Sequence, residues 1–455
     1  MASHAERGFG PVLANPPFRA LWIAQALAQT AQNSINFIQM VLIERVTGSS
    51  THLGIMILAF TLPGILVSPV AGILVDRVSK KWVLLVSNAL RVILTLGYFL
   101  VLGRWQGWSL LLSVYAIAFT ASSVGQFFSP AEAATIPLLV GRRNLVAANA
   151  LFNLTLAISQ VVGLIILGPL IVKLAGMQGS FIIIALMYAL ATLSVVRIPG
   201  ERTRPHVNGK VMAGWGQMRQ DLKEGWAFVL RERNVAVAMA HLATIATLIM
   251  ILAMLAPGFA ARVLGMAPED AVLVFAPAGV GMLLATGALG RWGYRLRKDV
   301  LGHLALMVAG FAFAALGILS YSFQARHVRI EAPIPPADLG LILSVVGLSF
   351  LLGLTMSSAN ILAQTIVQEE TPTPLRGRVF AVQYMLNNLV GIPPMLAIGG
   401  LADWLGIPPV LIGVAGAILL ATGMSAYVRY GRPSAEWLRP PLRSDMEGEE
   451  RSEQD

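Results

Sequence analysis

Long apolar runs alternate with short polar segments along most of the chain. The runs have roughly the 17–25 residues that an α-helix needs to cross a bilayer's hydrocarbon core. Twelve of them lie at Phe18–Ile43, Leu53–Val75, Trp82–Leu102, Trp108–Phe128, Leu145–Leu170, Phe181–Val196, Val235–Leu255, Val272–Leu289, Val300–Tyr321, Leu339–Ala363, Val379–Leu401 and Val410–Tyr427. A polar stretch divides them six and six. The pattern therefore predicts an all-α membrane protein with twelve transmembrane helices in two six-helix bundles.

The same pattern predicts the domain boundaries. We expect an N-terminal bundle over residues 1–198, a central loop over 199–234, a C-terminal bundle over 235–430 and a disordered tail over 431–455 that ends in clustered acidic residues. In the central loop, Leu222, Trp226, Val229 and Leu230 share one face of a helix, with charged residues opposite. This face indicates either a helix on the inner membrane surface or an ordinary linker helix.

Composition supports membrane residence and excludes several kinds of chemistry. The 455 residues are 56% hydrophobic and only 12% charged, about half the charged fraction of a soluble protein. With no cysteine, the chain has no disulfide, cysteine-bound zinc or thiol catalysis. We expect no cofactor and no metal. The first apolar run is too long and too rich in amides for a cleavable signal peptide.

The basic residues decide the predicted orientation. Of 33 Lys and Arg, 26 lie in segments on the side of the N-terminus, 6 lie on the other side, and Arg91 lies within a run. Cytoplasmic loops of membrane proteins carry such an excess. We therefore expect a multi-pass protein of the cell (inner) membrane with both termini and the central loop cytoplasmic. The net charge of +10 then reflects topology, and we expect no nucleic-acid partner.

A stripe of amides marks the first run. Gln25, Gln29, Gln32, Asn36 and Gln39 recur at spacings of three and four, so they share one helical face. Amides facing lipid would leave polar groups unpaired. The first four are therefore candidates for a substrate cavity, and the alternative is hydrogen bonding between helices.

A weak internal repeat adds further cavity candidates. Asn149, Asn153 and Gln160 form a similar stripe on the fifth run, and Gln383 and Asn387 take matching positions on the eleventh. Each pair follows a loop with two basic residues. The repeat indicates two pseudo-symmetric halves.

Charged residues are scarce within the runs. Arg91 lies about ten residues into the third run, and His241 lies in the seventh. We expect Arg91 to act in transport or gating, with carbonyls or water as partners because no acidic residue lies at matching depth in the sequence. His241 is a candidate proton site or a satisfied core histidine. With Glu132, they are the candidates for coupling, although the sequence places no carboxylate at the membrane midplane and leaves coupling open.

The loop between the second and third runs carries a charged motif. It reads Gly72-Ile-Leu-Val-Asp76-Arg77-Val-Ser-Lys80-Lys81 and resembles the G-x-x-x-D-R-x-x-[RK]-[RK] signature of the major facilitator superfamily. Three further segments carry the resemblance: Asn15–Trp22, Phe127–Pro137 and Gln368–Phe380. Together they look like the branch that includes the enterobactin exporter and related multidrug exporters.

The resemblance implies a gate at the inner side. It places Asp76 at the seam between the bundles, near Gly377. The gating residues that it implies are Gly72, Asp76, Arg77, Lys80, Lys81, Arg376, Gly377 and Arg378. The equivalent loop of the second half departs from the pattern, because Arg291 stands where the first half has Asp76.

The resemblance also implies a function. It implies a monomer in the lipid bilayer that exports a small amphipathic substrate by alternating access, with protons as candidate coupling ions. Facilitated transport, uptake and lipid flipping by the same fold stay open. A membrane enzyme is disfavoured because the chain lacks H-E-x-x-H, G-x-S-x-G, P-loop and paired intramembrane aspartate motifs. A sensor is disfavoured because no domain is appended to the helices.

Overall fold

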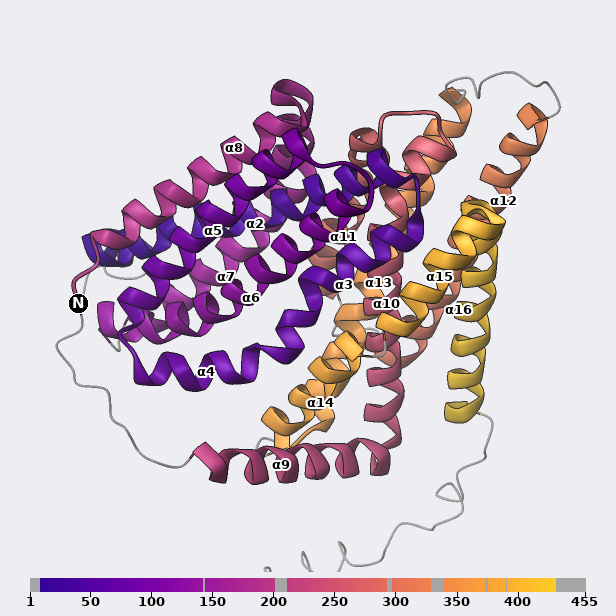
Figure 1. Ribbon diagram of the computed structural model, residues 1–455. Helices are drawn as coiled ribbons and strands as arrows, with labels where there is room; N and C mark the ends of the chain where they lie inside the picture. Colours follow the sequence, from indigo (N-terminus) through magenta and orange to yellow (C-terminus); the bar gives the residue numbers. More distant parts are fainter. Residues whose placement is uncertain are drawn as a thin grey trace, which may run out of the picture.

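The computed structural model describes residues 9–141, 144–200, 211–292, 297–328, 339–372, 375–389 and 391–430. Helices alone form the regular structure of these segments (Figure 1). They are α1 (Gly10–Leu13), α2 (Pro16–Thr47), α3 (Ser50–Leu66), α4 (Ser68–Arg77), α5 (Lys80–Arg104), α6 (Gly107–Leu139), α7 (Leu145–Val161), α8 (Gly168–Val196), α9 (Val211–Arg231), α10 (Arg233–Arg262), α11 (Ala271–Trp292), α12 (Lys298–Val328), α13 (Leu339–Glu370), α14 (Arg376–Leu389), α15 (Ile392–Leu405) and α16 (Ile407–Tyr430). The π-helical turn η3 (Val162–Leu167) joins α7 to α8, and the 3₁₀ turn η4 (Pro268–Asp270) precedes α11.

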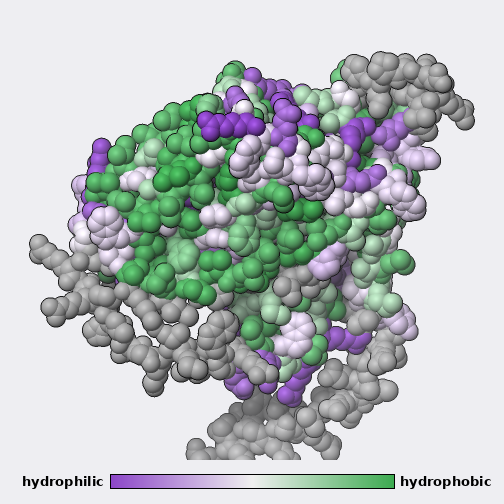
Figure 2. Space-filling model, in the orientation of Figure 1, coloured by the Kyte–Doolittle hydropathy of each residue, from purple (hydrophilic) through white to green (hydrophobic). Residues whose placement is uncertain are grey.

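The helices are those of a membrane protein, as the sequence predicts. In the described segments, nine helical stretches are long and apolar enough to cross a membrane. The 32-residue α2, which carries the amides, is not among them, and α3 is a shorter apolar helix of 17 residues. Hydrophobic side chains cover most of the visible face between the two ends of the helices (Figure 2).

Two expected runs differ in detail from the helices that form. The run Leu53–Val75 is divided into α3 and α4 at Val67, after Pro63, and a proline stands in the first turn of α4, where no N–H is needed. Conversely, helix continues from Leu145 to Val196, and the fifth and sixth runs are separated only by a sharp turn at Gly176. This glycine has φ of +66°, a left-handed conformation that side chains disfavour.

The helices pack in two groups. α2 packs against α7 and α8, and α5 and α6 pack against each other, with α5 also against α8. In the second group, α13 packs against α10, α11 and α12, and α12 packs against α16. Figure 1 shows the first group in indigo to magenta and the second in rose to yellow. The groups meet chiefly where α3 packs against α15 and α10.

The central helix α9 packs on the second group. Val229 is buried in a small apolar cluster with residues of α10, α13 and α14, and Leu222 packs against the same cluster. Glu224 of α9 forms an ion pair with Arg378 at the start of α14. Trp226 and Leu230 are exposed. The apolar face predicted from the sequence therefore divides between the bundle and the exterior.

Candidate functional site

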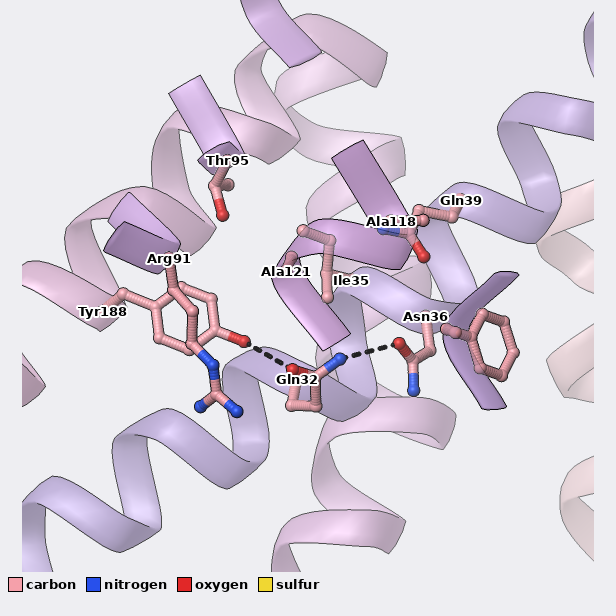
Figure 3. A pocket seen from close by; sticks show the side chains of 10 residues that line it. Gln32, Ile35, Asn36, Gln39, Arg91, Thr95, Ala118, Ala121 and Tyr188 are labelled. Carbon is pink, nitrogen blue, oxygen red and sulfur yellow. Dashed lines mark hydrogen bonds between the residues drawn. The ribbon is translucent and has the colours of Figure 1, made fainter. Parts of the chain in front are cut away.

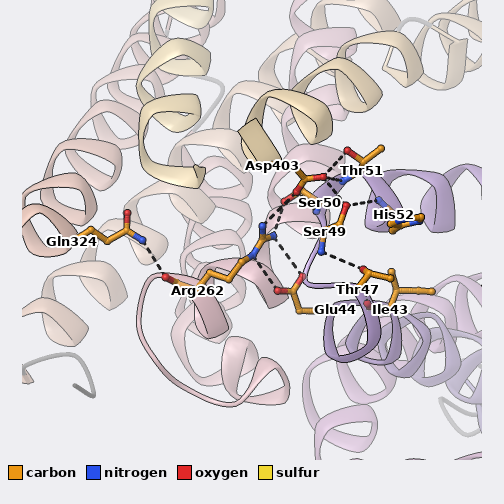
Figure 4. Close-up of polar contacts among 10 residues, drawn as sticks. All are labelled: Ile43, Glu44, Thr47, Ser49, Ser50, Thr51, His52, Arg262, Gln324 and Asp403. Carbon is orange, nitrogen blue, oxygen red and sulfur yellow. Dashed lines mark hydrogen bonds and ion pairs between the residues drawn. The ribbon is translucent and has the colours of Figure 1, made fainter. Parts of the chain in front are cut away.

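A network around Arg262 joins the two helix groups at the end opposite α9 (Figure 4). The guanidinium at the end of α10 lies 3.1 Å from the Glu44 carboxylate of α2 and 3.5 Å from the Asp403 carboxylate of α15. It also donates a 2.6 Å hydrogen bond to Ser50 Oγ. The Glu44 side chain is only 2% exposed. Because a buried carboxylate needs a compensating charge, Arg262 ties α2, α10 and α15 together.

Asp403 caps a helix of the other group. Its carboxylate accepts hydrogen bonds from the backbone N–H of Ser50 and of Thr51 at 2.6 and 2.9 Å. The hydroxyls of Ser49 and Thr51 add two bonds of 2.6 Å each. An anion is favourable at a helix N-terminus, and here it comes from α15 while the helix is α3. We call Glu44, Ser49, Ser50, Thr51, Arg262 and Asp403 the Arg262 network.

Two more ion pairs join the groups at the same end. Arg45 of α2 meets Glu269 of η4 at 2.5 Å, and Lys173 of α8 pairs with Asp270 of η4. The sequence shows these charges at the ends of runs, but it does not show their partners. The sequence did offer one signal for the Arg262 network. Glu44, Arg262 and Asp403 carry opposite charges and follow runs one, seven and eleven at the same side of the membrane.

The α9 end of the seam differs. α4 packs against α3, α5 and α6, and it stands apart from α14 in Figure 1. A Cβ added at Gly377 would have no neighbour within 4 Å among the described residues. The side chains of Asp76 and Arg77 and the surroundings of Gly72 lie outside the described part, so the contact predicted for Asp76 stays a prediction.

The other gating candidates lie at helix starts at this end. Lys80 and Lys81 begin α5, and the Lys81 ammonium donates to the Val196 carbonyl at the end of α8 at 3.0 Å. Arg376 Nε donates to the Thr371 carbonyl at 3.2 Å. Arg378 binds Glu224, as described above.

A polar pocket lies in the first helix group (Figure 3). It is lined by Gln32, Ile35, Asn36, Gln39, Phe60, Arg91, Thr95, Ala118, Ala121 and Tyr188. Tyr188 Oη donates to Gln32 Oε1 at 3.1 Å, and Gln32 Nε2 donates to Asn36 Oδ1 at 2.9 Å. Both amides lie in the middle of α2, so the pocket lies between the two ends of the helices.

The structure divides the amide stripe of α2. Gln32 and Asn36 line the pocket, as does Gln39, whose Nε2 donates to Tyr98 Oη at 2.8 Å. Gln25 lies elsewhere: it is 1% exposed, and its Nε2 lies 3.5 Å from the Phe152 carbonyl of α7. Gln29 is half-buried and does not line the pocket. Gln25 therefore fits the alternative interpretation of the stripe, which is hydrogen bonding between helices.

The candidates on the fifth and eleventh runs also lie outside this pocket. Asn149, Asn153 and Gln160 are exposed on α7. On α14, Gln383 Nε2 donates to Gln364 Oε1 of α13 at 2.7 Å, and Asn387 is half-buried.

The carboxylate of α6 is that of Glu132, which is 8% exposed. Arg91 lies against Gly125 of α6, about two turns from Glu132. Ion pairs between Glu132 and Arg91 do not occur among the described residues. The expectation that no acidic residue matches the depth of Arg91 therefore stays a prediction.

His241 lies in the second group beside a histidine that the sequence analysis missed. Its Nε2 lies 3.1 Å from Ser425 Oγ of α16, and its ring centroid lies 4.6 Å from that of His303 on α12. His303 Nδ1 lies 2.8 Å from the Asp299 carbonyl. These bonds match a satisfied core histidine. Groups of three or more potential metal ligands do not occur among the described residues.

Two groups of spanning helices, joined by ion pairs at one end and holding a polar pocket between the ends, define a membrane protein of the transporter class. The sequence model of the Major Facilitator Superfamily matches residues 21–393. The chain belongs to this family, as its motifs predict.

Relatives and solved structures agree. The chain is 23% identical over 397 residues to an uncharacterized MFS-type transporter, YfiS, of Bacillus subtilis (strain 168), covering 85% of this chain and 86% of that protein. It is 24% identical over 395 residues to the enterobactin exporter EntS of Escherichia coli O1:K1 / APEC, with 85% and 86% covered. A crystal structure of a bacterial homologue of the iron transporter ferroportin in the inward-facing state matches with a TM-score of 0.68, 12% identity, and 92% and 99% covered. The family and its relatives are transporters, so the chain is a transporter and not an enzyme.

Proposed function

We propose that this transporter exports a small amphipathic solute from the cell by alternating access. The observation that carries the proposal is the asymmetry of the seam between the two helix groups. Among the described residues, the ion pairs that join the groups lie at one end, where Arg262 binds Glu44 and Asp403. Alternating access requires a seam that closes at one end while it opens at the other. The likeness to a structure in an inward-facing state supports the same arrangement.

The orientation forms part of the proposal. We place twelve spans in the membrane, with domain boundaries at 198, 234 and 430, and with α9 and both termini in the cytoplasm. The excess of Lys and Arg at the α9 end supports this placement. Reporter fusions at Gly209 and at the C-terminus should both report the cytoplasm, and one fusion that reports the outside would rule out the twelve-span count.

Gln32 and Asn36 are proposed to contact the solute, because they line the pocket at the middle of α2. Gln29, Asn149, Asn153, Gln383 and Asn387 are proposed to line other parts of its path, whereas Gln25 is covered by α7. Double replacement of Gln29 and Gln32 by Leu should alter solute selectivity. The stability cost should not exceed about 0.6–2 kcal/mol, the value of one interhelical bond, because Gln32 loses its bond with Tyr188.

The proposal also covers the direction of transport and the ion that drives it. Export is supported by the similarity to a protein named as an enterobactin exporter. Protons are proposed to drive it by binding to Glu132 or His241, with Arg91 as a fixed positive charge. All three are buried ionisable groups among spanning helices. Uptake, facilitated transport and lipid flipping predict other directions or other cargo.

The test uses everted membrane vesicles that contain the overproduced protein. Ethidium and fluorescein are supplied outside, with and without an imposed pH gradient, against vesicles that carry the Arg262→Gln variant. Accumulation of either dye in the vesicle interior, abolished by the variant, supports export, and dependence on the gradient supports proton coupling. Loss of dye from preloaded vesicles would instead indicate uptake, and movement of a fluorescent lipid alone would indicate a flippase.

A further inference from the structure

Arg91 is a buried cation aimed into the pocket of Figure 3. Its side chain comes from the middle of α5, and the residue is 7% exposed. The guanidinium carbon lies 5.4 Å from the centroid of the Phe128 ring and 5.5 Å from that of Tyr188. Such cation–π contacts offset part of the cost of burial, but they do not use the five N–H donors of a guanidinium in its plane.

The neighbouring side chains do not satisfy these donors. In the part of the chain that the structure describes, no carboxylate lies within ion-pair distance of Arg91, and its Nε has no hydrogen-bond partner. Two amide oxygens of the pocket are engaged with neighbours: Gln32 Oε1 accepts from Tyr188, and Asn36 Oδ1 accepts from Gln32. Gln39 Oε1 has no hydrogen-bond donor, and Asn36 is left with its amide nitrogen to donate. The charged group of the pocket is therefore a cation, with the Asn36 amide nitrogen as a further donor.

Two residues of α6 bear on this arrangement. A Cβ at Gly125 would collide with Arg91 Nη2, so the glycine reserves the space that the guanidinium occupies. Glu132, the carboxylate of α6, lies about two turns further along this helix. It forms no ion pair with Arg91 among the described residues, so the N–H groups of Arg91 stay available to a ligand.

We propose that this pocket binds an anionic oxygen group of the solute, a carboxylate or a similar oxyanion. Arg91 and the Asn36 amide nitrogen donate to the oxygens, since charge-assisted hydrogen bonds to a guanidinium are the strong ones. Ile35 and Phe60, which line the same pocket, contact an apolar part of the solute beside the anionic group. That the bound anion is also carried across the membrane rests on the proposed function, whereas its binding does not.

The test exploits the lack of native cysteine. A single cysteine is introduced at Ala121, which lines the pocket, or at Ser109, an exposed residue at the start of the same helix. Each is treated with an anionic and a cationic methanethiosulfonate reagent of similar size. The anionic-to-cationic rate ratio at Ala121→Cys should exceed that at Ser109→Cys about tenfold, because an unpaired positive charge at close range attracts the anionic reagent and repels the cationic one.

Variants of Arg91 decide whether this charge is the cause. Arg91→Gln should remove the difference in ratio, whereas Arg91→Lys should keep most of it. Gly125→Ala keeps the charge but displaces the guanidinium, so it should lower the ratio. Gly97→Ala is the matched control, because a Cβ there meets only Ile117, at an ordinary 3.5 Å. An unchanged ratio in Arg91→Gln, or a cysteine at Ala121 that reacts with neither reagent, would overturn the proposal.

A binding measurement completes the test. 2-Naphthoate should slow labelling of Ala121→Cys at a concentration at which 2-naphthamide, the neutral amide of the same shape, does not, and Arg91→Gln should abolish that difference. Equal effects of both compounds would contradict an anion site. If the anion binds but vesicles move no solute, the proposed function fails and this site remains. If dyes move and Arg91 has no effect on charge preference, only this inference fails.

Discussion

The two ends of the seam between the helix groups are held in different ways. At one end, Glu44 is buried beside Arg262, and Asp403 of one group caps α3 of the other. At the α9 end, the ion pair between Glu224 and Arg378 lies within the second group and is partly exposed. A buried pair is costly to break because one charge is left uncompensated, while an exposed pair contributes little. The first end should therefore control the conformation.

Of the variants considered, Arg262→Gln should weaken the Arg262 end of the seam most. It leaves the Glu44 carboxylate buried without its cation and removes a link to α15. A partner lost from a buried pair costs about 3–5 kcal/mol, and we expect the lower value because Arg262 is 28% exposed. The midpoint of thermal unfolding should fall, and a cysteine introduced near Thr47 should become more reactive toward thiol reagents. Arg104→Gln, an exposed arginine at the same end of the helices, is the control and should change neither.

Asp76→Asn addresses the α9 end. If Asp76 closes this end in the outward-facing state, its loss should shift the balance between the two conformations by about 1–3 kcal/mol, a typical coupling energy. Transport of the dye should fall sharply while the amount of inserted protein stays normal. Glu369→Gln, which removes an exposed carboxylate at the same end, should leave transport nearly intact. Normal transport by Asp76→Asn would refute the gating role.

Gly399→Ala should open the first end by sterics alone. A Cβ at Gly399 would lie 2.9 Å from the Ser50 carbonyl oxygen, whereas one at Gly400 would have no neighbour within 4 Å. Overpacking of this kind costs about 1–3 kcal/mol, and here the cost applies only while α15 lies against α3. Thiol labelling near Ser50 should increase in Gly399→Ala and not in Gly400→Ala. Equal labelling of the two variants would mean that close packing at Gly399 does not hold the seam.

Glu224→Gln should have the smallest effect. Its pair with Arg378 is partly exposed, so about 0–1 kcal/mol is expected, and apolar packing of Val229 should keep α9 in place. Protease sensitivity of the central segment should change little. A release of α9 as complete as that caused by Val229→Asp would show that the exposed pair carries more energy than its environment implies.

Much of the fold was predictable because the bilayer imposes a length on each apolar run. The division into six and six runs, the central helix and the family follow from that length and from the motif around Asp76. The positions of the helix breaks were not predictable. One run is divided at Val67, and the fifth and sixth runs form nearly continuous helix that is interrupted by a turn at Gly176. Prolines and glycines permit such breaks, but packing decides which of them are used.

The site was predictable only in part. Spacing placed Gln32 and Asn36 correctly on one face of α2, but it could not separate them from Gln25, because the neighbouring helices decide which amides are covered. The contact of Arg91 with Gly125 depends on how α5 packs against α6. The hydropathy of one helix contains no information about which residue of the neighbouring helix lies opposite.

The most direct test of the account measures both ends of the seam in the same protein. Spin labels on cysteines at Val46 and Leu405 span the Arg262 end, and labels at Leu74 and Ala381 span the α9 end; all four residues are exposed. Pulsed electron paramagnetic resonance on the protein in nanodiscs gives the two distances, with and without Arg262→Gln. The account predicts that the first distance lengthens and the second shortens in the variant. Two unchanged distances, or two that lengthen together, would contradict alternating access controlled by the Arg262 network.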